Sequence, residues 1–207
     1  ERLLEMGEQM RVAVGQAHEL DDELLRYAKQ IGASGIQLNT PAIPGEKRWD
    51  FRDLLLLRTH CEEYGLRLEA LENVPIGFYD KAILGLPGRD EQIENYQTTI
   101  RDMGKAGIPF LGYHWMANKT WRTSRATPGR GGALVTAFDL DLVKDAPLTH
   151  GRIFTQEEVR RNYEYFIRAV LPVAEEAGVK LALHPDDPPV ESLGGVARIF
   201  GSFEAFQ

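Results

Sequence analysis

Short apolar runs alternate with longer amphipathic segments along most of this chain, and this rhythm constrains the fold more than any other feature. The short runs have the length and composition of buried strands, whereas the longer segments repeat apolar residues at helical spacing. Strands are expected at 11–15, 35–39, 67–72, 109–115 and 179–183. Because helices fall between them, the strands should run parallel and be joined by right-handed crossovers.

Polar residues mark where several helices should begin. Asp21 or Asp22, and later Asp50, are suited to cap a helix, because an aspartate side chain can accept a hydrogen bond from a free amide of the first turn. Thr155 and Glu158 fit a capping box, in which the hydroxyl and the carboxylate each satisfy such an amide. These signals predict where the first, second and last long helices start.

Two stretches carry weaker signals. Residues 116–154, after the fourth strand, show no regular periodicity, and we interpret them as an irregular insertion or lid. Their glycine-rich part, 128–132, lacks the spacing of a phosphate-binding loop and does not directly follow a strand. Near the end, 195–201 is expected to form a short helical turn, and Ser202 is expected to cap another helix.

Two architectures fit such a series of parallel units: an open doubly wound sheet, or part of an eight-stranded barrel. Asn39, Glu72, His114 and His184 all lie at the carboxyl ends of successive predicted strands. A closed barrel brings such residues to one mouth, whereas an open sheet spreads them along a crest. We therefore predict an α/β fold of the (β/α)8 TIM-barrel class, with residues 1–207 in a single domain.

The chain is short for such a barrel, which usually needs ~250 residues. Its 207 residues supply about five of the eight strands. Five strands alone would leave two edges unpaired and an apolar interior uncovered. We therefore expect the sequence to represent part of a longer polypeptide, whose remainder completes the barrel and its site.

Composition argues against several classes of partner. The net charge of −7 disfavours nucleic acid or an anionic membrane surface, and no apolar run approaches the ~20 residues of a membrane span. The single cysteine, Cys61, excludes an internal disulfide and is typical of a reducing compartment. Its helical context predicts an inert, partly buried thiol. We expect a cytoplasmic homo-oligomer that acts on a small molecule.

His184, Asp186 and Asp187 follow the last predicted strand in a proline-rich stretch. The three prolines of 184–189 prevent regular structure from continuing, so these side chains should be held on a stiff loop at the carboxyl end of a strand. An imidazole with carboxylates suits Mn, Fe or Zn. The alternative is that the aspartates bind backbone amides as turn residues. The strand-end position favours the functional interpretation.

Other candidates are weaker when each is taken alone. His114 is compatible with a catalytic role, but a half-buried histidine with a satisfied hydrogen bond is the commoner case. Glu72 could serve as a metal ligand, as a general base or merely as a loop residue. A carboxylate that ends an apolar strand is costly to bury unless it is paired or hydrogen-bonded, and this cost favours a functional role. Arg122, Arg125 and Arg130 match carboxylates or phosphates, although charged loops are usually only solvated.

Five blocks of sequence together resemble the D-mannonate dehydratase family. They are His-Pro-Asp-Asp-Pro-Pro at 184–189, Leu-Gly-Gly-Val-Ala-Arg-Ile at 193–199, Glu-Asn-Val-Pro-Ile at 72–76, Asn-Tyr-Gln-Thr-Thr-Ile at 95–100 and Trp-Arg-Thr at 121–123. The first block is a specific signal, and the others are individually weak. The resemblance extends from about residue 11 to the end of the chain.

This resemblance implies a xylose-isomerase-like TIM barrel that uses Mn²⁺, Fe²⁺ or another divalent metal. It implies a hydro-lyase that converts D-mannonate to 2-dehydro-3-deoxy-D-gluconate, with His184 as a metal ligand. The family's other ligands are a cysteine, a second histidine and an aspartate on later strands, and none has a matching position here; Cys61 is not that cysteine. Members often carry asparagine where this chain has His114, which leaves another sugar acid open as the substrate.

Dehydration of a sugar acid removes the C2 proton and expels the C3 hydroxyl, so a cation beside the developing enediolate is required. The hypothesis gives each candidate a role: His184 holds the metal, Asp186 and Asp187 orient the ligand sphere, Arg122 pairs with the substrate carboxylate, Asn39 and Arg125 bind substrate, and Glu72 and His114 orient hydroxyls or assist proton transfer. Two alternatives remain, a metal-dependent sugar isomerase or epimerase on the same barrel and a non-catalytic protein that binds sugar acids.

Overall fold

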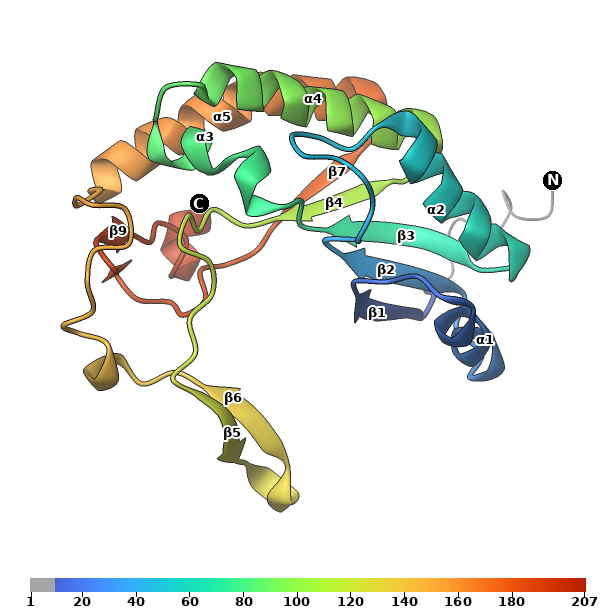
Figure 1. Ribbon diagram of the computed structural model, residues 1–207, viewed down its shortest axis with the longest axis horizontal. Helices are drawn as coiled ribbons and strands as arrows, with labels where there is room; N and C mark the ends of the chain where they lie inside the picture. Colours follow the sequence, from blue (N-terminus) through green and yellow to red (C-terminus); the bar gives the residue numbers. More distant parts are fainter. Residues whose placement is uncertain (1–9) are drawn as a thin grey trace. The chain divides into compact units, whose positions relative to one another are not determined.

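The computed structural model describes residues 10–207, in which strands and helices alternate over most of the chain (Figure 1). The principal elements are β1 (Ala13–Ala17), α1 (Asp22–Gln30), β2 (Gly35–Asn39), α2 (Phe51–Glu63), β3 (Arg67–Glu72), α3 (Asp80–Leu84), α4 (Arg89–Ala106), β4 (Phe110–Tyr113), β5 (Ser124–Pro128), β6 (Leu134–Ala137), α5 (Gln156–Ala177), β7 (Lys180–Leu183), β8 (Ser192–Leu193) and β9 (Val196–Ala197). No helix among the described residues has the length and apolar character needed to cross a membrane.

The main sheet has five strands in the order β1-β2-β3-β4-β7, so strands that follow one another in this α/β series are also neighbours in the sheet. The pairs β1–β2, β2–β3 and β3–β4 are parallel. A doubly wound sheet reverses its strand order at a switch point, whereas a barrel adds each strand to the same side of the last. The strand order therefore confirms the predicted α/β fold and its barrel class.

The two faces of the sheet differ in chemistry because successive side chains point to opposite sides. Ile36 and Leu38 of β2 are completely buried, and so is Leu71 of β3. Gln37 and Asn39 alternate with the apolar residues of β2 and are only partly buried. One face is thus the apolar core, and the other carries polar side chains toward the carboxyl ends of the strands.

The contacts divide the chain into two compact units. Among the described residues, the first comprises 10–78 together with 95–113 and 171–182, and it contains nearly all of the five-stranded sheet. The second comprises 79–94, 114–170 and 183–207. The prediction that 1–207 form one domain stays a prediction.

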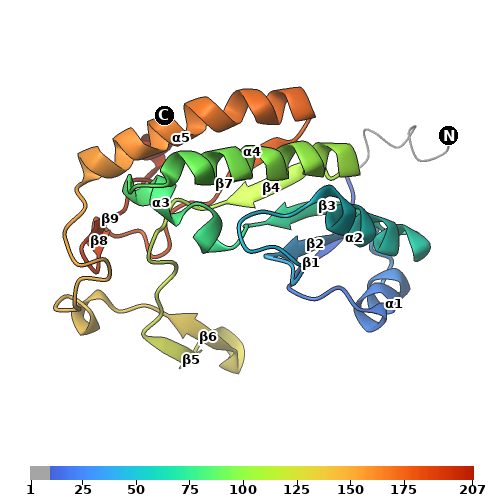
Figure 2. The ribbon, with the colours of Figure 1, turned by 45° about the horizontal axis from the view of Figure 1, so that its top comes forward.

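Within the first unit, the C-terminal parts of the long helices α4 and α5 lie side by side (Figure 2) and approach closely at Gly104. A Cβ atom at Gly104 would stand 2.4 Å from the backbone oxygen of Ala177. Glycine is therefore required at this position so that the two backbones can approach one another.

The helix starts follow the capping signals, with one difference. Asp21 is the N-cap of α1 and accepts a hydrogen bond from the amide of Leu24. Asp50 occupies the N-cap position of α2 but makes no capping bond with its side chain. Its carboxylate accepts instead from Nε of Arg48, at 3.1 Å. A nearby guanidinium thus competes with the helix amides for the same oxygen.

The capping box at the start of α5 is confirmed. The amide of Glu158 donates to Oγ1 of Thr155 at 3.3 Å, and the amide of Thr155 donates to Oε2 of Glu158 at 2.9 Å. The hydrogen bond from the amide of Thr155 holds the pKa of the Glu158 carboxyl below its usual value, because it stabilises the charged form.

Two short hairpins replace structure that was expected to be irregular or helical. Within 116–154, β5 and β6 pair in antiparallel fashion (Figure 1), and the amide of Gly129 donates to the oxygen of Ala133 to close the turn. At 195–201 the predicted helical turn is wrong, because 195–197 complete the hairpin of β8 and β9 and 198–201 are not helical. Its two-residue turn, Gly194-Gly195, has positive φ at both positions, which glycine adopts readily.

Candidate functional site

The first unit contains a buried carboxylate at the end of β3. Glu72 is only 6% exposed, and its two oxygens accept from Nε2 of Gln16 at 3.2 and 2.9 Å. Nε2 of Gln37 donates to Oε2 of Glu72 at 2.7 Å. These amide donors offset the cost of burying a carboxylate. The prediction that a buried Glu72 needs bonded partners is therefore met by two glutamines.

Asn39 lies directly beside Glu72, since the two residues face each other across the β2–β3 ladder. Oδ1 of Asn39 accepts from Oγ1 of Thr40 at 3.0 Å and from Nδ2 of Asn73 at 3.5 Å. The structure therefore brings together two residues that the sequence placed at strand ends. We call Gln16, Gln37, Asn39, Glu72 and Asn73 the Glu72 cluster.

Sequence reasoning missed the two glutamines of this cluster. Gln37 precedes Asn39 by two residues in β2, so the strand period of two indicated that both lie on the same face. Gln16 gave no such signal, because it is the extra residue in an irregularity of β1. Gly15 pairs with Gln37 and Ala17 with Leu38, which leaves Gln16 unmatched in the ladder.

The second unit contains His114, which follows β4. Nδ1 of His114 accepts a hydrogen bond from the amide of Met116 at 3.3 Å, and the oxygen of its backbone accepts from the hydroxyl of Tyr79 at 2.9 Å. Burial lowers the pKa of His114 to about 4, and electrostatic interactions with the nearby His184 and Arg198 side chains act in the same direction. The ring is therefore neutral at physiological pH, with its proton on Nε2, where it can donate.

Arg122 and Asp187 form a two-pronged ion pair in the second unit. Nη1 of Arg122 lies 2.8 Å from Oδ1 of Asp187, and Nη2 lies 2.5 Å from Oδ2. Nε of Arg122 also donates to Oγ1 of Thr136, at 3.1 Å. Such a fork fits a carboxylate. The carboxylate it holds is the protein's own, so a substrate carboxylate would have to exchange with Asp187.

Asp186 ties the loop after β7 to a segment further along the chain. Its Oδ2 accepts from the amide of Phe200 at 2.6 Å, and its own amide donates to the oxygen of Phe200 at 3.0 Å. Arg198 approaches its Oδ1 at 3.9 Å. Burial raises the pKa of Asp186, and these partners oppose the rise. Asp186 thus bonds a backbone amide, but a distant one rather than one in its own turn.

The remaining candidates are less closely connected. His184 is half-buried directly after β7. Arg125 lies exposed on β5, and no hydrogen bond or ion pair among residues 10–207 joins it to another predicted site residue. Cys61 is completely buried on α2, and burial raises its pKa to about 12, as an inert thiol requires.

The described residues do not by themselves fit a complete metal centre. Across 10–207, no three histidine, cysteine, aspartate or glutamate side chains are grouped so that they could share an ion. Near His184, Asp187 binds Arg122 and Asp186 binds the amide of Phe200. His184 is therefore a single candidate ligand in this part of the chain.

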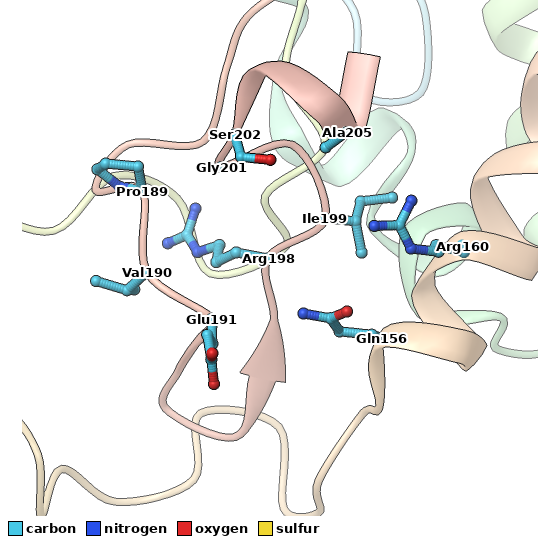
Figure 3. Close-up of a pocket in the computed structure, with 10 residues that line it drawn as sticks. All are labelled: Gln156, Arg160, Pro189, Val190, Glu191, Arg198, Ile199, Gly201, Ser202 and Ala205. Carbon is cyan, nitrogen blue, oxygen red and sulfur yellow. The ribbon is translucent and has the colours of Figure 1, made fainter. Parts of the chain in front are cut away.

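A pocket of about 310 Å³ also lies within the second unit (Figure 3). Gln156 and Arg160 line it from α5, and the rest of its lining comes from the segment 189–205. None of the predicted site residues lines this pocket, so it does not mark the predicted site.

Comparison with known proteins connects this geometry to a family. The sequence model of the D-mannonate dehydratase family matches residues 10–152 and 147–207. A mannonate dehydratase from Streptococcus pneumoniae is 34% identical over 201 residues, which cover 85% of this chain and 54% of that protein. A mannonate dehydratase from Thermotoga maritima is 31% identical over 92% of this chain and 61% of its own length. The chain thus spans a little more than half the length of these relatives.

Solved structures agree with the sequence matches. The structure of mannonate dehydratase from Streptococcus suis serotype 2 superposes with a TM-score of 0.84 at 36% identity, over 96% of this chain and 58% of that one. A D-psicose 3-epimerase from Clostridium cellulolyticum has a TM-score of 0.51 at 14% identity, over 86% of this chain and 53% of that one, which is a likeness of fold alone. From the family match over almost the whole chain, we conclude that this chain belongs to the D-mannonate dehydratase family.

Proposed function

We propose that the intact protein removes water from D-mannonate and releases 2-dehydro-3-deoxy-D-gluconate. The observation that carries this proposal is the family match over 10–152 and 147–207, together with relatives named for this reaction over most of the chain. Sugar isomerases and epimerases are not favoured, because the likeness to the epimerase is one of fold alone.

The reaction requires that a proton leave C2 and that the C3 hydroxyl depart with a proton. The Glu72 carboxylate, kept in place by Gln16 and Gln37, would accept a hydrogen bond or a proton from the substrate. Asn39 beside it would bind a hydroxyl group. These roles match the acceptor chemistry of carboxylate and amide oxygens.

His114 is better suited to donate a hydrogen bond than to act as a base. Its Nδ1 is occupied by the amide of Met116, and its Nε2 carries the proton of the neutral ring. We therefore assign it the role of orienting a substrate hydroxyl. Arg122 would bind the substrate carboxylate by exchange with Asp187, and Arg125, on the strand β5 that follows, would add positive charge.

We further propose that His184 is one ligand of a divalent cation, Mn²⁺ or Fe²⁺, and that Asp186 and Asp187 orient the loop that carries it. Such a cation supplies charge stabilisation for an enediolate. The described residues do not complete a coordination shell, so the roles above are those of the protein's own side chains.

Product analysis tests the proposed function. The intact protein with Mn²⁺ is incubated with D-mannonate, and a 2-keto-3-deoxy acid is measured; in parallel, aldoses and ketoses are tested for interconversion. Release of the keto-deoxy acid is expected. Interconversion of sugars without loss of water would identify an isomerase or epimerase, and saturable binding without turnover would identify a binding protein.

We also propose that the protein acts in the cytoplasm and as a homo-oligomer. The single cysteine supports the cytoplasmic compartment and has no bearing on the oligomeric state. Light scattering coupled to size-exclusion chromatography measures the assembly, and a mass of more than one copy is expected.

A further inference from the structure

Three neighbouring strands carry strained backbone at their carboxyl ends. Gln16 in β1, Thr40 just after β2 and Asn73 just after β3 have φ values of 65°, 43° and 64°. Residues with a Cβ atom adopt this left-handed region at a cost, and such strain persists only where the surrounding structure enforces it. Gln16 and Asn73 belong to the Glu72 cluster, and Thr40 bonds Asn39 of the same cluster; all three lie in the first unit.

At Gln16 the strain has a visible consequence. Gln16 is the unmatched residue between Gly15 and Ala17, and a bulge of this kind turns a side chain away from the direction that a regular strand would give it. Its amide reaches the Glu72 carboxylate, with its closer contact at 2.9 Å. The local backbone is therefore distorted where Gln16 bonds the carboxylate.

Two glycines leave the space that the cluster occupies. A Cβ atom at Gly15 would approach Cβ of Gln37 to 3.3 Å, and one at Gly112 would approach Cα of Glu72 to 3.3 Å. Both separations are tighter than ordinary van der Waals contact. Glycine at these two positions thus leaves the space in which Gln37 and Glu72 make their 2.7 Å bond, and a larger residue there would displace one of the two.

The cluster also contains an acceptor that lacks a donor. Oδ1 of Asn73 is buried and has no hydrogen-bond partner among the described residues. An unsatisfied buried acceptor costs free energy unless a ligand or water donates to it. Asn73 contacts Asn39, which faces Glu72, so this acceptor belongs to a group of oxygens that suits the hydroxyl groups of a polyol.

We propose that Gln16 and Gln37 are positioning residues that fix the Glu72 carboxylate for reaction, in a subsite of the Glu72 cluster that binds the hydroxyl groups of a sugar acid. This inference rests on the proposed dehydratase function. Two amide donors hold the carboxylate oxygens and restrict its rotation. Glu72 would then meet the substrate in one orientation, as chemistry at a single carbon requires.

The test replaces Gln37 by methionine, which has a similar volume but no donor, in the intact protein. We expect kcat with D-mannonate to fall by about tenfold to a hundredfold, with KM changed by less than about threefold. Gln16→Met should act in the same direction. Gln30→Met is the matched control, because Gln30 is an exposed residue at the end of α1, and it should keep wild-type kinetics.

A double-mutant cycle separates positioning from a structural role. In a Glu72→Gln background the carboxylate is absent, so Gln37→Met should lower kcat no further. A loss of equal size in both backgrounds, an effect on KM alone, or wild-type kinetics of Gln37→Met would each overturn the inference while the dehydratase function stands. If wild-type protein does not dehydrate D-mannonate, the proposed function fails, and this inference fails with it.

Discussion

Among single residues, His114 illustrates how one hydrogen bond restricts chemical role. The amide of Met116 occupies Nδ1, and burial keeps the ring neutral with a pKa of about 4. A histidine in this state presents one donor, at Nε2, and lacks a free basic nitrogen near neutral pH. Its side chain thus offers a substrate what an asparagine amide also offers, namely an N–H group.

This equivalence predicts how substitutions at His114 rank. His114→Asn keeps a donor and should retain most of the wild-type kcat with D-mannonate, whereas His114→Ala should lower kcat by roughly a hundredfold. Steady-state kinetics of the two variants in the intact protein measure the ranking. Equal losses in both variants would show that the N–H group is not what matters.

Replacement of His184 should lower the metal content of the protein. Loss of a residue that only hydrogen-bonds a metal ligand weakens metal binding by roughly 10–100-fold. Since we propose that His184 is itself a ligand, His184→Ala should weaken Mn²⁺ binding by more than that. Elemental analysis of the purified intact protein and titration with Mn²⁺ measure this change. His60→Ala is the control, since His60 lies on α2 and bonds Asp22; unchanged metal content in the His184 variant would remove the assignment.

At the scale of elements, the start of α5 shows a local signal that determines local structure. Thr155 and Glu158 satisfy each other's amides. Thr155→Ala should lower the free energy of unfolding by about 1 kcal/mol. Urea denaturation of the intact protein measures it, and an unchanged midpoint would show that tertiary packing alone fixes this helix end.

The capping carboxylate adds a pH dependence. The pKa of Glu158 is lowered from its usual 4.5 in the folded protein, chiefly by the amide of Thr155. A lowered pKa means that the stabilisation is present above the unfolded pKa and is lost as the pH falls through the folded pKa. The difference in stability between wild type and Glu158→Gln should therefore shrink from pH 7 to about pH 3. A difference that grew on acidification would contradict this sign.

The contact between α4 and α5 gives a second prediction at this scale. Gly104→Ala would gain about 1 kcal/mol of helix propensity, but its Cβ would stand 2.4 Å from the oxygen of Ala177. Overpacking of this kind costs about 1–3 kcal/mol, so a net loss of stability is expected in thermal or urea unfolding. Gly77→Ala is the matched control, because no atom lies within 4 Å of its added Cβ; equal effects of the two would refute the clash.

For the molecule as a whole, the sequence predicted what depends on period and local signals. The bounds of β2 and β3 agree with expectation, and the sequential strand order follows from the alternation of units. The strand β1 begins two residues later than expected, and it contains the bulge at Gln16. The five-residue helix α3 was missed, because it is too short to show a helical period.

The site was predictable to a smaller extent, because much of it depends on tertiary contacts. The positions of Asn39 and Glu72 at strand ends were enough to predict that they lie together, as they do across the β2–β3 ladder. The pairing of Arg122 with Asp187 joins positions 65 apart in sequence, and no local pattern indicates such a contact. Asp186 likewise bonds the amide of Phe200 across an intervening hairpin. These bonds exist only once the chain has folded.

The unmatched residue in β1 has a consequence for how this family's sequences can change in length. Gln16 reaches its partner because β1 contains one residue more than β2 over that stretch. Deleting any one residue there would restore a regular ladder and turn the amide elsewhere, although the strand itself would survive. A change in the number of residues in β1 should therefore break this contact just as loss of the glutamine itself would, even where the fold is kept.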